Sequence, residues 1–164
     1  MIFITVGTHE QPFDRLLKCI DKLVEDGIIS EEIVCQKGYT DYEPKNYKSE
    51  KLISYEKMQE NIEKARIVIT HGGPASFIAP LSIGKIPIVV PRKKEFNEHI
   101  NNHQLEFSKE VAKRMKNIIV VETEEELKNA IINYDKIVKQ LSNKNNSNNK
   151  AFIKRLITEI EGIL

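Results

Sequence analysis

The sequence predicts an α/β fold in which helices cover both faces of one parallel sheet. Short apolar runs alternate along the chain with amphipathic stretches of helical periodicity. The apolar runs are continuous, which is typical of strands that are buried on both faces of a parallel sheet. These two observations indicate a single Rossmann-like, doubly wound parallel sheet. Because such sheets bind ligands at the carboxyl ends of their strands, the loops that follow the strands are the places to look for a site.

Six apolar runs predict the strands, and the first of them, MIFITVG at residues 1–7, ends in a glycine. The other runs are EIVCQKG (32–38), KLIS (51–54), RIVIT (66–70), IPIVVP (86–91) and NIIVV (117–121). A polar loop is expected over residues 38–50. Most of the intervals between strands carry a helical pattern, as parallel pairing requires.

The helices are predicted from periodicity and from their end signals. A helix over Phe13–Glu25 places its apolar residues on one face and ends before Gly27. Thr123, with Glu126 three residues later, forms a capping box at the start of TEEELKNAI. The remaining predicted helices occupy Tyr55–Ala65, Pro74–Gly84 and Asn97 to about Met115.

Three parts are predicted along the chain. Residues 1–141 form the α/β domain, residues 142–150 (SNKNNSNNK) an asparagine-rich linker, and residues 151–164 a C-terminal amphipathic helix. This helix is expected to pack against the domain or against a partner, and ordinary core packing explains its apolar face equally well.

Composition restricts the class of protein. The 164 residues suit one domain, and 40% hydrophobic with 30% charged residues is typical of a soluble globular protein. The net charge of +1 gives no indication of nucleic-acid binding, which normally needs a clustered basic excess. Cys19 and Cys35 lie in hydrophobic runs and are expected to be buried thiols in a reducing compartment. No signal peptide or membrane-spanning run is visible, so we expect a cytoplasmic protein.

A turn with the composition of an anion site follows the strand RIVIT. It reads His71, Gly72, Gly73, Pro74, alanine and Ser76. Glycines let backbone amides approach an anion, proline suits the first helical position, and a helix N-terminus offers free amides beside the serine hydroxyl. The turn is neither GxGxxG nor a P-loop. Phosphate binding and a tight capped turn both remain open from this stretch alone.

Two further groups of residues could join that turn. Gly7 and Thr8 follow the first strand and either contact a phosphate or belong to a capped turn. In the helix predicted from Asn97, one polar face could grip a polyhydroxylated ligand or simply face solvent. The polar residues of that face are Glu98, His99, Asn102 and Glu106, whereas Gln104 falls inside the apolar arc, an unusual position for a polar residue.

Other chemistries are less well supported by the residues. His99 and His103 have zinc-ligand spacing, but the HExxH pattern is incomplete and no third ligand is evident, so no metal is expected. Ser76 sits where a phosphate would bind, which argues against a hydrolase triad with His71. An NAD site is disfavoured because GxGxxG is absent and the second strand ends in Gln36 rather than in an acidic residue.

The segments ITHGGPASFIAPLSIGKIPIVVP (69–91) and EHINNHQLEF (98–107) together resemble the C-terminal, donor-binding domain of glycosyltransferase family 28, which has the GT-B fold. The resemblance extends over roughly residues 1–120. It includes two small stand-alone forms: the donor-binding subunit of the eukaryotic two-subunit UDP-N-acetylglucosamine transferase, and bacterial PssE-type subunits of capsule and exopolysaccharide synthesis. The opening MIFITVGTHEQPFDRLL is similar to the bacterial subunits. The resemblance implies that the sheet is equivalent to the C-terminal half of a GT-B enzyme.

The resemblance also implies roles for single residues. It implies that the backbone of Tyr55 reads the uracil edge, that Glu98 and His99 hold the donor sugar hydroxyls, and that Asn102 and Gln104 belong to the adjoining segment. His71 is expected to stabilise the leaving diphosphate. The residues expected to bind this diphosphate are Gly7, Thr8, His71, Gly72, Gly73, Pro74 and Ser76. Ala79 departs from the family pattern, which has a glutamate that grips the ribose there, so another group must bind the ribose.

The implied function is that of the donor-binding and catalytic subunit of an inverting UDP-sugar glycosyltransferase. UDP-galactose is the first expected donor, for a β-1,4-galactosyltransferase, before UDP-glucose and UDP-N-acetylglucosamine; no cofactor or essential metal is expected. A membrane-anchored, PssD-like partner would hold the lipid-linked acceptor, supply the catalytic base and recruit the chain to the inner face of the membrane. The alternative is a non-catalytic accessory subunit that stabilises or stimulates a separate transferase.

Overall fold

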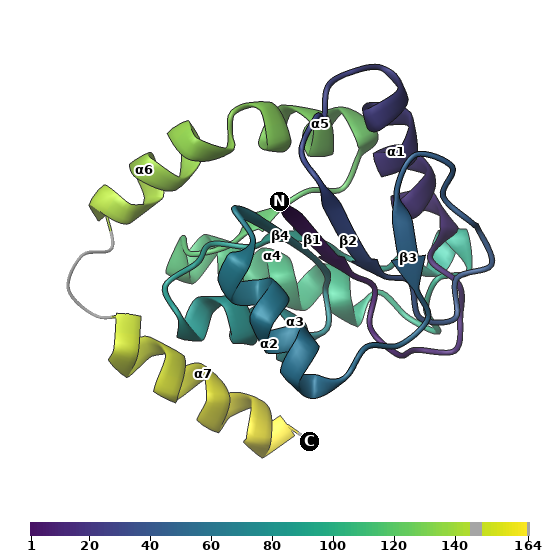
Figure 1. Ribbon diagram of the computed structural model, residues 1–164. Coiled ribbons are helices and arrows are strands. Elements are labelled where there is room, and N and C mark those ends of the chain that lie inside the picture. Colours follow the sequence, from purple (N-terminus) through teal and green to yellow (C-terminus); the bar gives the residue numbers. More distant parts are fainter. Residues whose placement is uncertain (145–148, 164) are drawn as a thin grey trace.

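The computed structural model describes residues 1–144 and 149–163 and contains one six-stranded sheet, all of whose strands are parallel (Figure 1). The strand order is β3-β2-β1-β4-β5-β6, so the chain reverses direction across the sheet between β1 and β4. The strands are β1 (Ile2–Thr5), β2 (Ile33–Gln36), β3 (Lys48–Glu50), β4 (Ile67–His71), β5 (Ile88–Val90) and β6 (Ile119–Val120). The predicted Rossmann-like, doubly wound parallel sheet is confirmed.

Helices cover both faces of this sheet (Figure 1). Helices α1 and α5 lie on one face, and α2, α3 and α4 lie on the other. The helices are α1 (Asp14–Glu25), α2 (Tyr55–Lys64), α3 (Pro74–Ser82), α4 (His103–Met115), α5 (Glu124–Ile132), α6 (Tyr134–Lys144) and α7 (Asn149–Ile163), with a short 3₁₀ helix at Lys94–Phe96. Every crossover between neighbouring parallel strands therefore passes over a face of the sheet, which places the loops after the strands along one edge.

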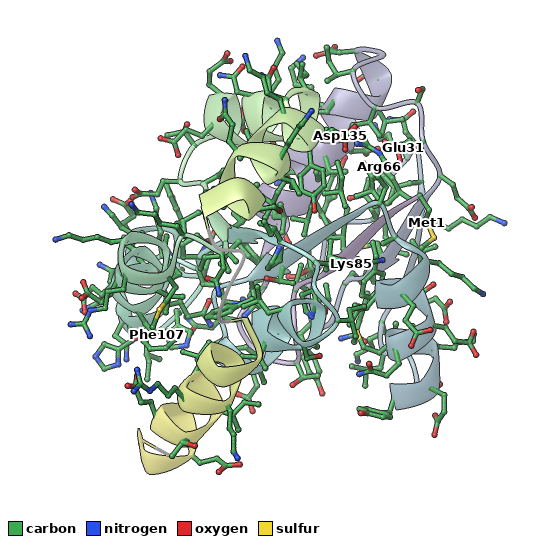
Figure 2. The ribbon with its side chains drawn as sticks, turned by 90° about the vertical axis from the view of Figure 1, so that its left-hand side faces the viewer. Met1, Glu31, Arg66, Lys85, Phe107 and Asp135 are labelled. Carbon is green, nitrogen blue, oxygen red and sulfur yellow. The ribbon has the colours of Figure 1, made fainter. Side chains whose placement is uncertain are left out.

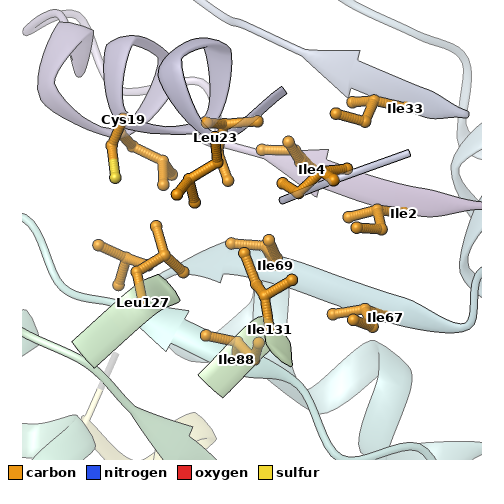
Figure 3. Close-up of a cluster of buried hydrophobic side chains, with 14 of the residues drawn as sticks. Ile2, Ile4, Cys19, Leu23, Ile33, Ile67, Ile69, Ile88, Leu127 and Ile131 are labelled. Carbon is orange, nitrogen blue, oxygen red and sulfur yellow. The ribbon is translucent and has the colours of Figure 1, made fainter. Parts of the chain in front are cut away.

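The core on the α1 side is built from alternate residues of the central strands (Figure 3). Ile2 and Ile4 of β1 and Ile69 of β4 pack against Leu23 of α1 and Leu127 of α5. Since side chains alternate along a strand, the intervening residues face the other helical layer. Both cysteines are free and buried, as predicted, and burial raises the pKa of Cys19 to about 11 and that of Cys35 to about 12.

The opposite layer has two smaller clusters. Phe3 of β1 packs with Ile62 of α2, whereas Phe77 of α3 packs with Val89 of β5. Leu156 of α7 is buried in the second of these clusters, and α7 lies against α3. The C-terminal helix therefore packs on this domain.

Three predicted boundaries differ from the structure. The third strand is β3 rather than residues 51–54; it is a polar edge strand, which pairs with β2 alone and needs no apolar run. The helix predicted from residue 97 begins at His103, because Asn97 adopts a left-handed conformation (φ 55°) and interrupts the helical path. Of the predicted linker, residues 142–144 belong to α6 and 149–150 to α7, and residues 145–148 lie outside the described residues.

The amino-terminal edge of the sheet is fixed by charged groups (Figure 2). Arg66, just before β4, pairs with Glu31 and with Asp135, and the amino group of Met1 lies 3.2 Å from a carboxylate oxygen of Glu31. Lys85 Nζ donates hydrogen bonds to three carbonyl oxygens at the end of α2 and so caps that helix. These contacts leave the opposite, carboxyl edge for ligand binding.

Candidate functional site

A cleft of about 910 Å³ lies at the carboxyl edge of the sheet, between the ends of β1 and β4 and the helices α2 and α3. The predicted site residues that line it are Gly7, Thr8, Tyr55, His71, Gly73, Pro74 and Ser76. The other lining residues are Thr5, His9, Glu10, Gln36, Met58, Gln59, Ile62, Ala75 and Ala79. Distant parts of the sequence therefore meet around one cleft, as the parallel topology predicts.

His71 forms a pair with Ser76 at the base of α3. Its Nδ1 accepts a hydrogen bond from Gly73 N–H at 3.0 Å, and its Nε2 lies 2.7 Å from Ser76 Oγ. Burial, aided by the charge of Arg92, lowers the pKa of His71 to about 4, so the ring is neutral at physiological pH. A neutral ring that accepts at Nδ1 carries its proton on Nε2 and donates it to Ser76 Oγ. The Ser76 hydroxyl is thus oriented to donate its own proton to an anion in the cleft.

Two glycines enclose the His71 ring. A β-carbon on Gly7, whose φ is +75°, would lie 2.4 Å from His71 Nε2, and a β-carbon on Gly73 would lie 2.2 Å from His71 Cε1. Both distances are far shorter than van der Waals contact, so a side chain at either position would displace the ring. These glycines therefore seat the imidazole, a function that their sequence pattern alone did not indicate.

The amides of Gly72 and Gly73 are not directed at the cleft, contrary to the expectation for this turn. Gly72 N–H donates to Gln104 Oε1 at 3.1 Å, and Gly73 N–H donates to His71 Nδ1. Pro74 has no amide hydrogen, whereas Ala75 lines the cleft in the open first turn of α3. The groups left for an anion are therefore the Ser76 hydroxyl and the N-terminus of α3.

Arg92 is a residue that sequence reasoning missed. It is completely buried, and its guanidinium donates to the carbonyl oxygens of Gln11 at 2.6 Å, Glu98 at 3.1 Å and Val6 at 2.8 Å. Its backbone N–H donates to Gln104 Oε1 at 3.2 Å, which explains the polar residue inside the apolar arc. Burial lowers the pKa of Arg92 to about 10, which leaves it charged at neutral pH. Arg92 thus ties the loop after β1 to the loop after β5.

Glu98 is buried and faces Arg15 rather than the cleft. Its carboxylate accepts hydrogen bonds from Arg15 Nε at 2.8 Å and Nη2 at 3.0 Å, and from Lys93 N–H at 3.0 Å. This pairing joins the loop after β5 to α1. The structure gives the Glu98 carboxylate this structural role, and the sugar contact implied for Glu98 stays a prediction.

His99 and Asn102 lie before α4 and do not line the cleft. The His99 ring stacks on His9, with ring centroids 4.6 Å apart and an interplanar angle of 17°, and only His9 of the two reaches the cleft. Burial, with the nearby His9, lowers the pKa of His99. Asn102 Oδ1 accepts a hydrogen bond from Lys94 N–H at 2.9 Å and so holds its own loop. Their implied sugar contacts likewise stay predictions.

Residues 1–144 and 149–163 contain neither a cluster of metal ligands nor a membrane-spanning helix. No three His, Cys, Asp or Glu side chains in these ranges are grouped so that they could hold a metal ion. No helix in them has both the length and the apolar character needed to cross a bilayer. The expectation that no essential metal is needed stays a prediction.

The strand order defines a Rossmann-like domain, and the His71–Ser76 pair with the open first turn of α3 forms a candidate anion site at the carboxyl edge of its sheet. The sequence matches the glycosyltransferase family 28 C-terminal domain over residues 1–160. The chain belongs to this family, which confirms the resemblance drawn from its motifs.

Two curated relatives and one solved structure are similar to the chain. It is 32% identical over 121 residues to the human UDP-N-acetylglucosamine transferase subunit ALG13 and 31% identical over 122 residues to the mouse protein of the same name. Each match covers 68% of this chain and 10% of the relative, so the chain spans a small part of their length. The glycosyltransferase SnogD from Streptomyces nogalater has a similar fold, with a TM-score of 0.52 and 15% identity over 96% of this chain and 42% of that one.

Proposed function

We propose that this chain is the donor-binding and catalytic subunit of an inverting glycosyltransferase that uses a UDP-sugar. The observation that carries the proposal is the His71–Ser76 pair at the N-terminus of α3, because a Ser76 hydroxyl that accepts from His71 keeps its own proton available to a ligand in the cleft. Such a hydroxyl and helix end suit a diphosphate. Membership of the family, and the relatives named as UDP-N-acetylglucosamine transferase subunits, support a UDP-sugar as the ligand.

In the proposed reaction, an acceptor hydroxyl attacks the anomeric carbon of the sugar on the face opposite the diphosphate. A new carbon–oxygen bond forms while the bond between the anomeric carbon and the diphosphate oxygen breaks, and its electron pair leaves with UDP. Negative charge therefore grows on the diphosphate, where Ser76 and the open end of α3 donate hydrogen bonds. His71 acts through Ser76 by fixing the direction of its hydroxyl. A base on the partner takes the acceptor proton.

The proposed partner is a membrane-anchored, PssD-like subunit that holds a lipid-linked acceptor and recruits this chain to the inner face of the membrane. The described residues form one Rossmann-like domain with the proposed donor cleft, whereas in a GT-B enzyme the reaction takes place between two such domains. Phe96 and Ile100, on the loop after β5, are 51% and 71% exposed, and side chains of this kind suit a protein contact. The proposed pathway is capsule or exopolysaccharide synthesis, with UDP-galactose as the first donor to test.

Calorimetric titration of the isolated chain with UDP tests the donor site. We expect Ser76→Ala and His71→Ala to weaken UDP binding by about tenfold or more, because each removes or misdirects a hydrogen bond to a charged ligand. Ser82→Ala, at the other end of α3, and His103→Ala, outside the cleft, are matched controls that should leave the affinity unchanged. Absence of UDP binding by the unaltered chain, alone or with its partner, would refute the donor-subunit proposal.

Catalysis is tested separately by co-expression with candidate membrane partners and transfer assays with UDP-galactose, UDP-glucose and UDP-N-acetylglucosamine. The proposal expects Ser76→Ala to lower transfer while the complex with the partner still forms. Undiminished transfer by a complex containing Ser76→Ala would instead favour the accessory-subunit alternative.

A further inference from the structure

The end of the cleft between α2 and α3 is mainly apolar. These two helices lie side by side (Figure 1), and Met58 and Ile62 of α2 line the cleft together with Ala79 of α3. Tyr55 is 74% exposed at the start of α2. The walls formed by Met58, Ile62 and Ala79 suit the flat faces of a nucleobase and a sugar ring, but these three side chains cannot form hydrogen bonds with the hydroxyl groups of the sugar.

Besides the Tyr55 hydroxyl at the start of α2, the carboxamide of Gln59 is the polar group of this helix that lines the cleft. It is half-buried, and its carboxamide makes no hydrogen bond to any part of the chain that the structure describes. Gln36, at the floor of the cleft, is committed elsewhere: its Nε2 donates to Thr5 Oγ1 at 3.4 Å and its Oε1 accepts from Ile53 N–H at 3.2 Å. Gln59 therefore offers one acceptor and two donor hydrogens to a ligand, whereas Gln36 serves the fold.

The position of Gln59 along the cleft indicates which part of a ligand it meets. Ser76 and Ala79 both line the cleft and are three residues apart on α3, which corresponds to a rise of about 4.5 Å. In a nucleoside diphosphate the ribose follows the phosphates directly. If the base occupies the apolar end of the cleft between α2 and α3, a ligand whose phosphates lie at Ser76 places its ribose near Ala79, whose methyl group cannot bind a hydroxyl. The neighbouring helix α2 contributes Gln59 to the lining of the same cleft.

We propose that Gln59 binds the ribose 2′- and 3′-hydroxyls of the donor nucleotide and so determines the preference of this site for ribonucleotides. The inference rests on the proposed function, since it takes a UDP-sugar as the ligand. A carboxamide oxygen accepts from one hydroxyl while its amino group donates to the other, which suits a vicinal diol. Because the carboxamide is neutral, it binds the diol without placing a negative charge near the diphosphate.

The test compares ligands with and without the hydroxyls on proteins with and without the carboxamide. UDP and 2′,3′-dideoxy-UDP are titrated calorimetrically into the isolated full chain, into Gln59→Ala and into Glu60→Ala. Glu60 is an exposed neighbour on α2 that does not line the cleft, so it serves as the matched control. We expect the unaltered chain and the control to prefer UDP by about three- to tenfold, the effect of neutral hydrogen bonds.

Gln59→Ala is expected to bind the two ligands equally, with the affinity that the unaltered chain has for the dideoxy ligand. Three outcomes overturn the inference: an unaltered chain that binds UDP without preferring it, a Gln59→Ala variant that keeps the full preference, or a variant that weakens both ligands equally. The last result would assign Gln59 to the base or to the fold. Failure of the unaltered chain to bind UDP at all would instead refute the proposed function, so the two failures are distinguishable.

Discussion

Replacing Glu98 by glutamine tests whether this residue stabilises the fold or contacts the donor sugar, as the family resemblance implies. Glutamine keeps the size of the side chain and one oxygen that can accept from Lys93 N–H, but it removes the charge that faces Arg15. The substitution therefore leaves a guanidinium without its carboxylate at the junction of α1 and the loop after β5. We expect a loss of stability and no specific loss of sugar recognition.

The magnitude follows from the burial of the pair. The side chain of Glu98 is 3% exposed and that of Arg15 is 20% exposed. Removing one partner from a fully buried pair costs about 3–5 kcal/mol, whereas an exposed pair contributes less than about 1 kcal/mol. Since Arg15 is in partial contact with water, we expect Glu98→Gln to lower the free energy of unfolding by about 2–3 kcal/mol. With a urea dependence of about 2 kcal/mol per molar, the midpoint of unfolding falls by about 1–1.5 M.

Urea denaturation followed by circular dichroism measures this midpoint, and calorimetry compares UDP with UDP-sugar on the same variant. Glu110→Gln, which breaks an exposed pair with Arg114 on α4, is the matched control and should cost less than about 0.5 kcal/mol. The double variant Arg15→Met with Glu98→Gln should cost less than the sum of the two single changes, because the pair is lost only once. An unchanged midpoint combined with loss of the preference for UDP-sugar over UDP would refute this reasoning and support the sugar contact.

Three further predictions follow from single contacts. Burial lowers the pKa of His71 from 6.5 to about 4, so between these pH values the unfolded chain binds a proton that the folded chain does not. The free energy of unfolding therefore falls as the pH drops from above 6.5 towards 4, and by pH 5 the loss is about 2 kcal/mol. Urea titrations at several pH values should show this loss in the unaltered chain but not in His71→Asn. Gly7→Ala should abolish UDP binding in calorimetry, because its methyl group would occupy the space of the His71 ring. Gly84 has a similar φ of +81° but no atom near its β-carbon position, so Gly84→Ala should cause backbone strain alone and keep the affinity for UDP. Lys85→Met should lower the unfolding free energy by about 1–3 kcal/mol in urea denaturation, because it leaves three carbonyl oxygens at the end of α2 without their donor.

The elements that the sequence predicted well are those whose pattern is local. The apolar runs of β1 and β4 are strands because each is buried on both faces, and no distant information is needed to recognise them. The capping box of α5 is also present in modified form: Glu126 N–H donates to Thr123 Oγ1, while the Glu126 carboxylate accepts from the N–H of Glu122 rather than from that of Thr123. The local apolar pattern identified the strands, and short-range hydrogen bonding identified the cap.

The errors occurred where a distant residue decides the local conformation. Residues 97–102 have helical periodicity, but Glu98 pairs with an arginine 83 positions earlier, and this contact holds the segment in a loop. Gln104 was a local sign of a different long-range contact, because a polar residue in an apolar arc needs buried partners, which here are the N–H groups of Gly72 and Arg92. Arg92 gave no such sign, since an arginine after a strand is usually exposed. Its partners are backbone carbonyl oxygens of other loops, which no side-chain pattern reveals.

The burial of Arg92 is intelligible if it serves both the fold and the ligand. Burial removes the water around its charge, and its Nε has no hydrogen-bond partner among the described residues. Both effects lower the stability of the fold, so stability alone does not explain why this arginine is buried. After burial, the charge of Arg92 is the next cause of the lowered pKa of His71, consistent with a positive potential at the His71–Ser76 pair. A diphosphate at Ser76 would therefore be attracted by a cation that it does not contact and that water does not screen. The cation also holds together the loops after β1 and β5, so in the proposed reaction little reorganisation would remain when charge develops on the leaving group.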